Sequence, residues 1–193
     1  MGGRQPLTGT ASRFRPVGVP DAAIAHAKQI RAERDRRYAN YFEPHETDDR
    51  WVGDLGELVA RWWLARSRPV DLEALDRGDV HGLPDLVLEG VAIGVKTAVR
   101  TVDPRPHYFA PVNAPHIDEP VAEFLFLSYN VRTCVMWILG GMARARFREL
   151  ARFYPAGSVV PPAFRVSAPG VWSGVPISAL TPPDSWLVGV RGR

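Results

Sequence analysis

Residues 83–97 read Leu-Pro-Asp-Leu-Val-Leu-Glu-Gly-Val-Ala-Ile-Gly-Val-Lys-Thr, and the fold that we expect follows from this segment. The run from residue 86 to residue 95 is rich in Val, Ile and Leu and is broken only at Glu89-Gly90. A two-residue break with glycine in second place is typical of a tight turn, because glycine supplies a positive φ. The pattern therefore predicts a β-hairpin in which Leu88 lies opposite Val91.

Two charged side chains fall on one face of this hairpin. The turn places Asp85 opposite Gly94, and the alternation of side chains along a strand puts Lys96 on the same side as both. A carboxylate that faces inward in an apolar hairpin is costly unless it is paired or binds a cation. Lys96 is thus either the salt-bridge partner of Asp85 or a group that holds a phosphate or a water nucleophile.

Lysine is rare in this chain. Of 24 Lys and Arg residues, only Lys28 and Lys96 are lysines. A lysine in the middle of a strand of such a chain indicates a role that arginine cannot fill. The compact ammonium group with its adjustable pKa is the main difference between the two side chains.

An amphipathic helix is predicted over residues 48 or 49 to about 67. Gly53 and Gly56 lie inside it, and each costs roughly 1 kcal/mol relative to alanine, so they indicate a close approach to another element. Gly53, Glu57 and Ala60 share one face of the helix. This spacing predicts a helix that lies tight on a sheet and directs Glu57 at the hairpin.

The order Gly53-x-x-Gly56-Glu57 on a helix, then Pro84-Asp85, then a strand with x-x-Lys96 resembles the PD-(D/E)xK nucleases, the restriction-endonuclease-like superfamily. The resemblance covers about residues 51–97. The strands expected at 124–129 and 133–139 and the helix expected at 147–153 continue the order seen in phage and restriction-type members. The implied fold is an α/β domain with a central mixed β-sheet of four or five strands flanked by helices.

The resemblance implies a metal site at the hairpin. Asp85 would be the central metal ligand, Lys96 the catalytic lysine, Glu57 the helix carboxylate and the backbone carbonyl of Val95 a further ligand. The family usually has an acidic residue or Gln two positions before the lysine, where this chain has Gly94. Either a carboxylate from elsewhere takes this place or catalysis has been lost. Glu57 is the preferred replacement, and the further acidic candidates are Asp79, Glu89 and Asp54.

The implied activity is a DNA endonuclease dependent on Mg²⁺ or Mn²⁺, from a phage or a restriction system, with RNA left open as a substrate. Mg²⁺ prefers oxygen ligands and needs only one or two carboxylates beside the substrate phosphate. A homodimer would suit double-strand cutting, because one site hydrolyses one strand. Two alternatives stay open: a nuclease fold that binds nucleic acid without cutting it, and an interaction protein in which Asp85 and Lys96 form an internal salt bridge.

The charge is modestly basic, with a net charge of +3 and a pI of about 9.3. Arg100 and Arg105 follow the hairpin, Arg144 and Arg146 precede and enter a predicted helix, and His81 precedes the hairpin; all five are candidates for contacts with nucleic acid. A further arginine cluster lies on an earlier predicted helix: Arg31, Arg34, Arg36 and Arg37. In a chain biased towards arginine, ordinary solvated helix faces explain these clusters equally well.

The chain is expected to form one soluble, cytoplasmic domain. It has 193 residues, of which 46% are hydrophobic, which is enough for a single core. No apolar run approaches the length of about 18 residues that a membrane span needs, and no signal peptide is visible. We expect a flexible arm over 1–20 and a nuclease domain over 21–193 with its core at about 47–152.

Three further segments carry expectations. A helix is predicted from Asp21 to about Tyr41. Residues 103–120 contain five prolines and are predicted to form a long loop beside the site, since loops of this length are often functional. Short strands are predicted near 164–166 and 186–190.

Overall fold

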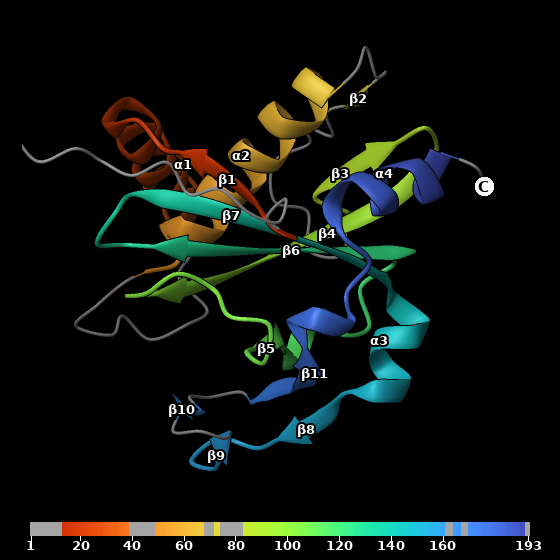
Figure 1. Cartoon of the computed structure of the whole chain (residues 1–193). Helices are drawn as coiled ribbons and strands as arrows, with labels where there is room; N and C mark the ends of the chain where they lie inside the picture. The colour runs from red at the N-terminus through yellow and green to blue at the C-terminus, as the bar shows by residue number, and fades with distance from the viewer. Residues whose placement is uncertain are drawn as a thin grey trace, which may run out of the picture.

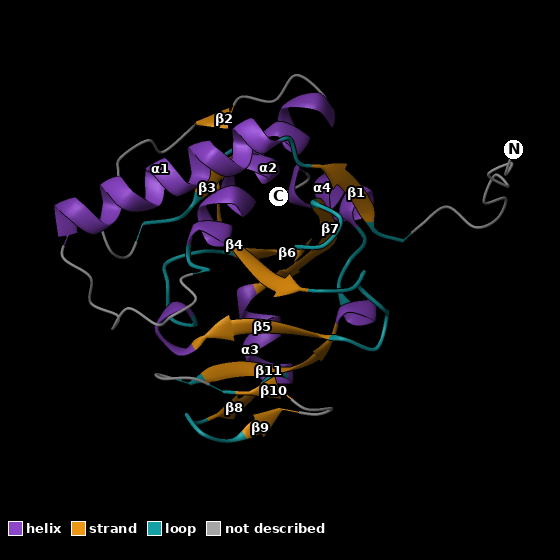
Figure 2. Ribbon diagram, turned by 90° about the vertical axis from the view of Figure 1, so that its left-hand side faces the viewer, coloured by secondary structure: helices purple, strands orange, loops and turns teal. Residues whose placement is uncertain are grey.

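The computed structural model describes residues 13–38, 49–67, 72–73, 83–160, 164–166 and 170–191. They form a mixed α/β fold in three layers, with a six-stranded sheet in the middle (Figure 1). Helices cover one face of this sheet, and a second, smaller sheet and a short helix cover the other face (Figure 2). Among the described helices, none is both long enough and apolar enough to cross a membrane.

The central sheet is mixed, as expected, but it has six strands. In spatial order these are β1 (Arg15–Gly18), β7 (Val135–Ala143), β6 (Glu123–Asn130), β4 (Val91–Arg100), β3 (Leu86–Leu88) and β2 (Leu72–Glu73). β4 and β6 run parallel, whereas the other neighbours are antiparallel. β6 is buried along its whole length because layers cover both of its faces.

The β3–β4 hairpin has the predicted register. Leu88 pairs with Val91, and Glu89 and Gly90 have φ values of 49° and 81°, the two positive values that a type I′ turn requires. β3 begins at Leu86, whereas β4 continues to Arg100. The strand with Lys96 therefore runs on past the start of its hairpin partner.

The helical layer consists of α1 (Asp21–Tyr38), α2 (Trp51–Ser67) and α4 (Pro183–Arg191). α2 lies tight against β4 at Gly56, where an added Cβ would come 1.9 Å from Thr97 Oγ1. At Gly53 an added Cβ would meet nothing within 4 Å. The prediction of a close approach is confirmed at Gly56 and wrong at Gly53.

The other face of the sheet is covered by α3 (Arg144–Leu150) and by a second sheet in the order β5 (Phe109–Asn113), β11 (Val171–Pro176) and β8 (Arg152–Tyr154). The smaller elements are η1 (Ala114–His116), β9 (Val159–Val160), β10 (Phe164–Arg165) and η2 (Ile177–Ala179). Between the two sheets, the Phe126 and Phe147 rings pack with centroids 5.2 Å apart. Buried residues extend from Phe14 to Val190, so the core is not confined to 47–152.

The prediction of a flexible arm over 1–20 is wrong for residues 13–20. β1 pairs with β7, and Phe14 and Val19 at its ends are buried. The polar and proline-rich composition hid this strand, because an edge strand needs few apolar side chains once its backbone completes a sheet. Residues 1–12 lie outside the described residues.

Other boundaries also differ from expectation. The strand predicted near 186–190 is helix α4, whose Trp186, Leu187 and Val190 follow helical spacing and are buried. The helix predicted at 147–153 is α3, which ends at Leu150 and is followed by β8. The predicted loop at 103–120 contains β5 and η1. The helix from Asp21 is described to residue 38.

Candidate functional site

Asp85 stands immediately before β3, where the two strands of the hairpin separate. Its Oδ2 accepts a hydrogen bond of 2.6 Å from the Val95 N–H. The last backbone pair of the hairpin is Leu86 with Ile93, so this side chain takes the place of the next rung and holds the carboxylate at the edge of β4. In an extended strand the C=O of a residue points to the same side as its N–H. The Val95 carbonyl therefore faces the same edge as Asp85.

The Lys96 side chain lies between two carboxylates. Its Nζ is 2.7 Å from Oε2 of Glu119 and 3.7 Å from Oδ2 of Asp85, and the side chain is only 10% exposed. The contact with Asp85 confirms that the two residues share a face of the hairpin. The contact with Glu119 was not predicted.

Glu119 and His116 are functional candidates that the residue patterns did not reveal. Both come from the segment between β5 and β6, where Oε1 of Glu119 is hydrogen-bonded to Nδ1 of His116. The prediction of a loop beside the site is the only signal that points to them. No residue spacing connects this segment to the motif on the hairpin.

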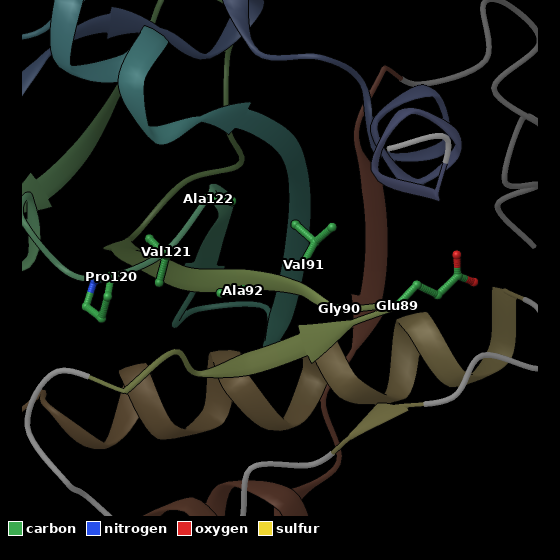
Figure 3. Close-up of a pocket in the computed structure, with 7 residues that line it drawn as sticks. All are labelled: Glu89, Gly90, Val91, Ala92, Pro120, Val121 and Ala122. Atoms are coloured by element: carbon green, nitrogen blue, oxygen red, sulfur yellow. The ribbon is translucent and has the colours of Figure 1, made fainter.

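The segment that carries Glu119 is attached to β4. Figure 3 shows Pro120, Val121 and Ala122 beside Ala92, where they line a surface pocket together with the tip of the hairpin. The Ala122 N–H donates to the Ala92 carbonyl at 2.8 Å. The segment that carries Glu119 is therefore fixed to β4, the strand that carries Lys96.

Arg144 also holds this segment. Its Nε donates to the Val121 carbonyl at 2.9 Å, and its Nη1 donates to the Ile117 carbonyl at 3.4 Å. These two carbonyls flank Glu119 along the chain. Arg144 thus makes internal contacts, and its contact with nucleic acid stays a prediction.

The other residues that were predicted to contact nucleic acid lie in different surroundings. Arg100 donates to the Phe109 carbonyl at 3.1 Å and lies over the Tyr108 ring at 4.7 Å; burial lowers the pKa of its guanidinium. Arg146 pairs with Glu149 at 2.9 Å. Arg105 is exposed, and His81 lies outside the described residues.

Glu57 approaches the site from the helical layer. Its Oε2 lies 3.3 Å from Nη2 of Arg34 on α1. Burial raises the pKa of Glu57 to about 7, the charge of Asp85 adds to this rise, and Arg34 opposes it. The charge of Asp85 thus acts on Glu57, while the role of Glu57 as a metal ligand stays a prediction.

The pKa values of Asp85 and Glu119 move in opposite directions. Burial raises the pKa of Asp85, although the charge of Lys96 and the Val95 N–H oppose it. Burial alone would raise the pKa of Glu119 as well, but the hydrogen bond with His116 and the charge of Lys96 outweigh burial and leave this pKa below its ordinary value. Glu119 is thus the carboxylate whose charged form the site favours.

Gly94 lies two residues before Lys96, at the place where the resemblance expects an acidic residue. It pairs with Phe124 of β6. An added Cβ would come 3.1 Å from Phe124 Cδ1 and 3.4 Å from Lys96 Cε. A side chain at this position would press on the phenylalanine ring and on the lysine stem.

The remaining acidic candidates have other surroundings. Asp54 is 1% exposed, accepts hydrogen bonds of 2.8 and 2.9 Å from Arg31 and is also paired with Arg34, so it joins α1 to α2. Glu89 occupies the turn at the far end of the hairpin from Asp85. Asp79 lies outside the described residues.

Arg61 is a further residue of the site that was not predicted. It follows Glu57 by one helical turn on α2, and its Nη2 donates to the Asp85 carbonyl at 3.4 Å. Its Nε is buried and has no hydrogen-bond partner among the described residues. A guanidinium with an unused donor beside the carboxylates is suited to a phosphate oxygen.

The donors at the site are the kind that Mg²⁺ and Mn²⁺ prefer. They are the carboxylates of Asp85, Glu119 and Glu57 and the carbonyl of Val95. Within the described ranges, no three His, Cys, Asp or Glu side chains form a group that could hold a metal ion. Mg²⁺ commonly takes one or two protein carboxylates and keeps several waters, so two of these carboxylates suffice.

Comparisons of this chain with protein-family models, with curated proteins and with solved structures found no match. The geometry around Asp85 and Lys96 is therefore the basis on which a function is proposed.

Proposed function

We propose that the protein is a metal-dependent nuclease of the restriction-endonuclease-like type that hydrolyses phosphodiester bonds in DNA. One observation carries the proposal: Nζ of Lys96 lies 3.7 Å from the Asp85 carboxylate at the point where β3 and β4 separate. Glu57 on the adjacent helix interacts electrostatically with this carboxylate. The mixed sheet flanked by helices supplies the framework that such a site needs.

The residues have distinct tasks in the proposed reaction. Asp85 and a second carboxylate would hold Mg²⁺ or Mn²⁺, which would supply Lewis-acid activation of the scissile phosphate. The bond from the Val95 N–H keeps the Asp85 carboxylate in place, so little reorganisation is needed when charge develops.

Lys96 acts on the phosphate and on the attacking water. Its ammonium is largely buried, so it stabilises negative charge on the water or on the pentacovalent phosphorane more strongly than an exposed lysine would. Its compact charge suits this task better than a guanidinium.

DNA is proposed as the partner on the grounds of charge and chemistry. The net charge is +3, and Arg105 is exposed just after the strand that carries Lys96. Arg61 offers an unused donor inside the site. A homodimer would suit the cutting of both strands of a bound duplex, because one site hydrolyses one strand.

The test is cleavage of supercoiled plasmid DNA with Mg²⁺ or Mn²⁺, together with single-stranded DNA and RNA as alternative substrates. We expect cleavage by the parent and its loss in Asp85→Asn and Lys96→Gln. The matched control is Lys28→Gln, because Lys28 is the only other lysine and lies over the Trp51 ring at 4.9 Å. A parent that cuts no substrate with either ion, or a Lys96→Gln variant that cuts as fast as the parent, would contradict the proposal.

A non-catalytic interaction protein is the second candidate. The contact of 2.7 Å between Lys96 and Glu119 favours it, because an internal ion pair accounts for both charges without a substrate. Removing one partner of such a pair typically costs about 3–5 kcal/mol, whereas apolar replacement of all partners is often neutral. Two results together would select this candidate. The parent cuts no substrate, and the triple variant Lys96→Met, Asp85→Leu and Glu119→Leu unfolds at the same urea concentration as the parent.

A further inference from the structure

We infer that Glu119, held by His116, is the second acidic ligand of the metal site. It takes the role of the acidic residue that the PD-(D/E)xK nucleases usually carry two positions before the lysine, where this chain has Gly94. The inference rests on the proposed nuclease function and assigns the missing ligand to a segment outside the motif.

The Glu119 carboxylate lies close enough to Asp85 to share a metal ion with it. Its Oε2 is 2.7 Å from Nζ of Lys96, and Oδ2 of Asp85 is 3.7 Å from the same atom. The two oxygens are therefore at most 6.4 Å apart, the sum of these distances. Two oxygens on one Mg²⁺ are separated by up to about 4.2 Å, because each bond is about 2.1 Å long. If the two oxygens stand at this upper limit, sharing one ion requires the Asp85 carboxylate to move towards Glu119 and the Lys96 ammonium to move aside.

The surroundings of Gly94 indicate that the second acidic ligand comes from another segment. A side chain here would touch Phe124 and the stem of Lys96. With glycine at this position, the lysine is approached instead by Glu119 from the segment between β5 and β6.

Glu119 is also better suited to a metal ion than Glu57. The Glu57 carboxylate is already matched by the Arg34 guanidinium at 3.3 Å. Glu119 and Asp85 instead approach the same lysine, with Nζ of Lys96 at 2.7 Å from Glu119 and 3.7 Å from Asp85. Glu119 is therefore better placed than Glu57 to share an ion with Asp85.

His116 and the neighbouring backbone hold Glu119 in place. Nδ1 of His116 is hydrogen-bonded to Oε1 of Glu119, which leaves Oε2 directed at Lys96. Ligating carboxylates in metal sites are commonly oriented by such outer hydrogen bonds. The bonds from Arg144 and Ala122 fix the backbone on both sides of Glu119. His116 is therefore a positioning residue.

The test is the affinity for Mn²⁺, measured by electron paramagnetic resonance and by calorimetry without any substrate. We expect Glu119→Gln to raise the Kd for Mn²⁺ by on the order of tenfold or more and to abolish cleavage. Asp118→Asn is the matched control, because it removes a neighbouring carboxylate that pairs with the exposed Arg148. Its Kd should equal that of the parent. Glu119→Asp keeps the charge but shortens the reach, so its Kd should lie between those of the parent and Glu119→Gln.

A second measurement tests whether His116 positions Glu119 through its hydrogen bond and not only through its bulk. The amide of His116→Asn can replace the ring Nδ1 as a hydrogen-bond donor, whereas His116→Ala cannot. We expect the Asn variant to keep a lower Kd for Mn²⁺ than the Ala variant. Equal losses in both variants would overturn the positioning role.

The outcomes separate the two proposals. If the parent binds no Mn²⁺ and cuts no nucleic acid, the proposed function fails, and the ligand assignment fails with it. If the parent binds Mn²⁺ and cuts, but Glu119→Gln binds Mn²⁺ as tightly as the parent while Glu57→Gln does not, the nuclease stands and the assignment of Glu119 is overturned.

Discussion

Replacing Glu57 by glutamine should make the protein more resistant to rising pH. Burial raises the pKa of Glu57 from 4.5 to about 7, so the folded state holds a proton that the unfolded state releases. The free energy of unfolding therefore falls as the pH rises through this window. A tenfold difference in proton affinity between the two states is worth about 1.4 kcal/mol, so between pH 5 and pH 8 the loss caused by Glu57 amounts to about 2–3 kcal/mol.

Glu57→Gln removes this loss because glutamine does not titrate. Urea unfolding of the parent and the variant at pH 5, 6, 7 and 8 measures it. We expect the difference in unfolding free energy to change in favour of the variant by about 2–3 kcal/mol across this range. Glu149→Gln is the control, since it removes an exposed carboxylate that pairs with Arg146. A difference between parent and Glu57→Gln that is the same at pH 5 and pH 8 would refute the reasoning.

Two further substitutions test the packing that supports the site. Gly56→Ala would place a Cβ 1.9 Å from Thr97 Oγ1, and we expect it to lower the unfolding free energy by about 1–3 kcal/mol. Much of this loss should be recovered when Gly56→Ala is combined with Thr97→Gly. No recovery would mean that α2 does not lie against β4 as described. Asp54→Asn leaves Arg31 and Arg34 without their buried carboxylate; we expect a loss of about 3 kcal/mol in urea unfolding, and a loss under about 0.5 kcal/mol would show that the ion pairs do not hold α1 on α2.

The sequence was informative where neighbouring residues determine the structure. The turn at Glu89-Gly90 and the alternation around it set the register of the hairpin, and the register brings Asp85 and Lys96 together. The sequence also predicted a helix from Asp21, and helical spacing predicted α2 with Glu57 on the face towards the hairpin. These features follow from turn geometry and from periodicities of 2 and 3.6 residues, which act within one or two elements.

Tertiary structure decided what the arginines contact. Arg31 and Arg34 lie 20 residues or more from Asp54 along the chain, and Arg144 lies 23 residues from Val121. A sequence does not reveal whether a guanidinium faces a carboxylate, a carbonyl or solvent. Their contacts depend on how α1 packs on α2 and how the segment before β6 packs against α3.

Local patterns were thus sufficient for the hairpin that brings Asp85 and Lys96 together and for helix α2, which carries Glu57. Only the tertiary structure decided that residues 15–18 complete the sheet, that residues 183–191 form a helix, and that Glu119 reaches Lys96. Glu119 lies 23 residues beyond Lys96 along the chain. It follows β5, a strand of the second sheet, and precedes β6, where the chain returns to the central sheet. No local pattern encodes a contact made by such a return, because its geometry is set by packing between the two sheets.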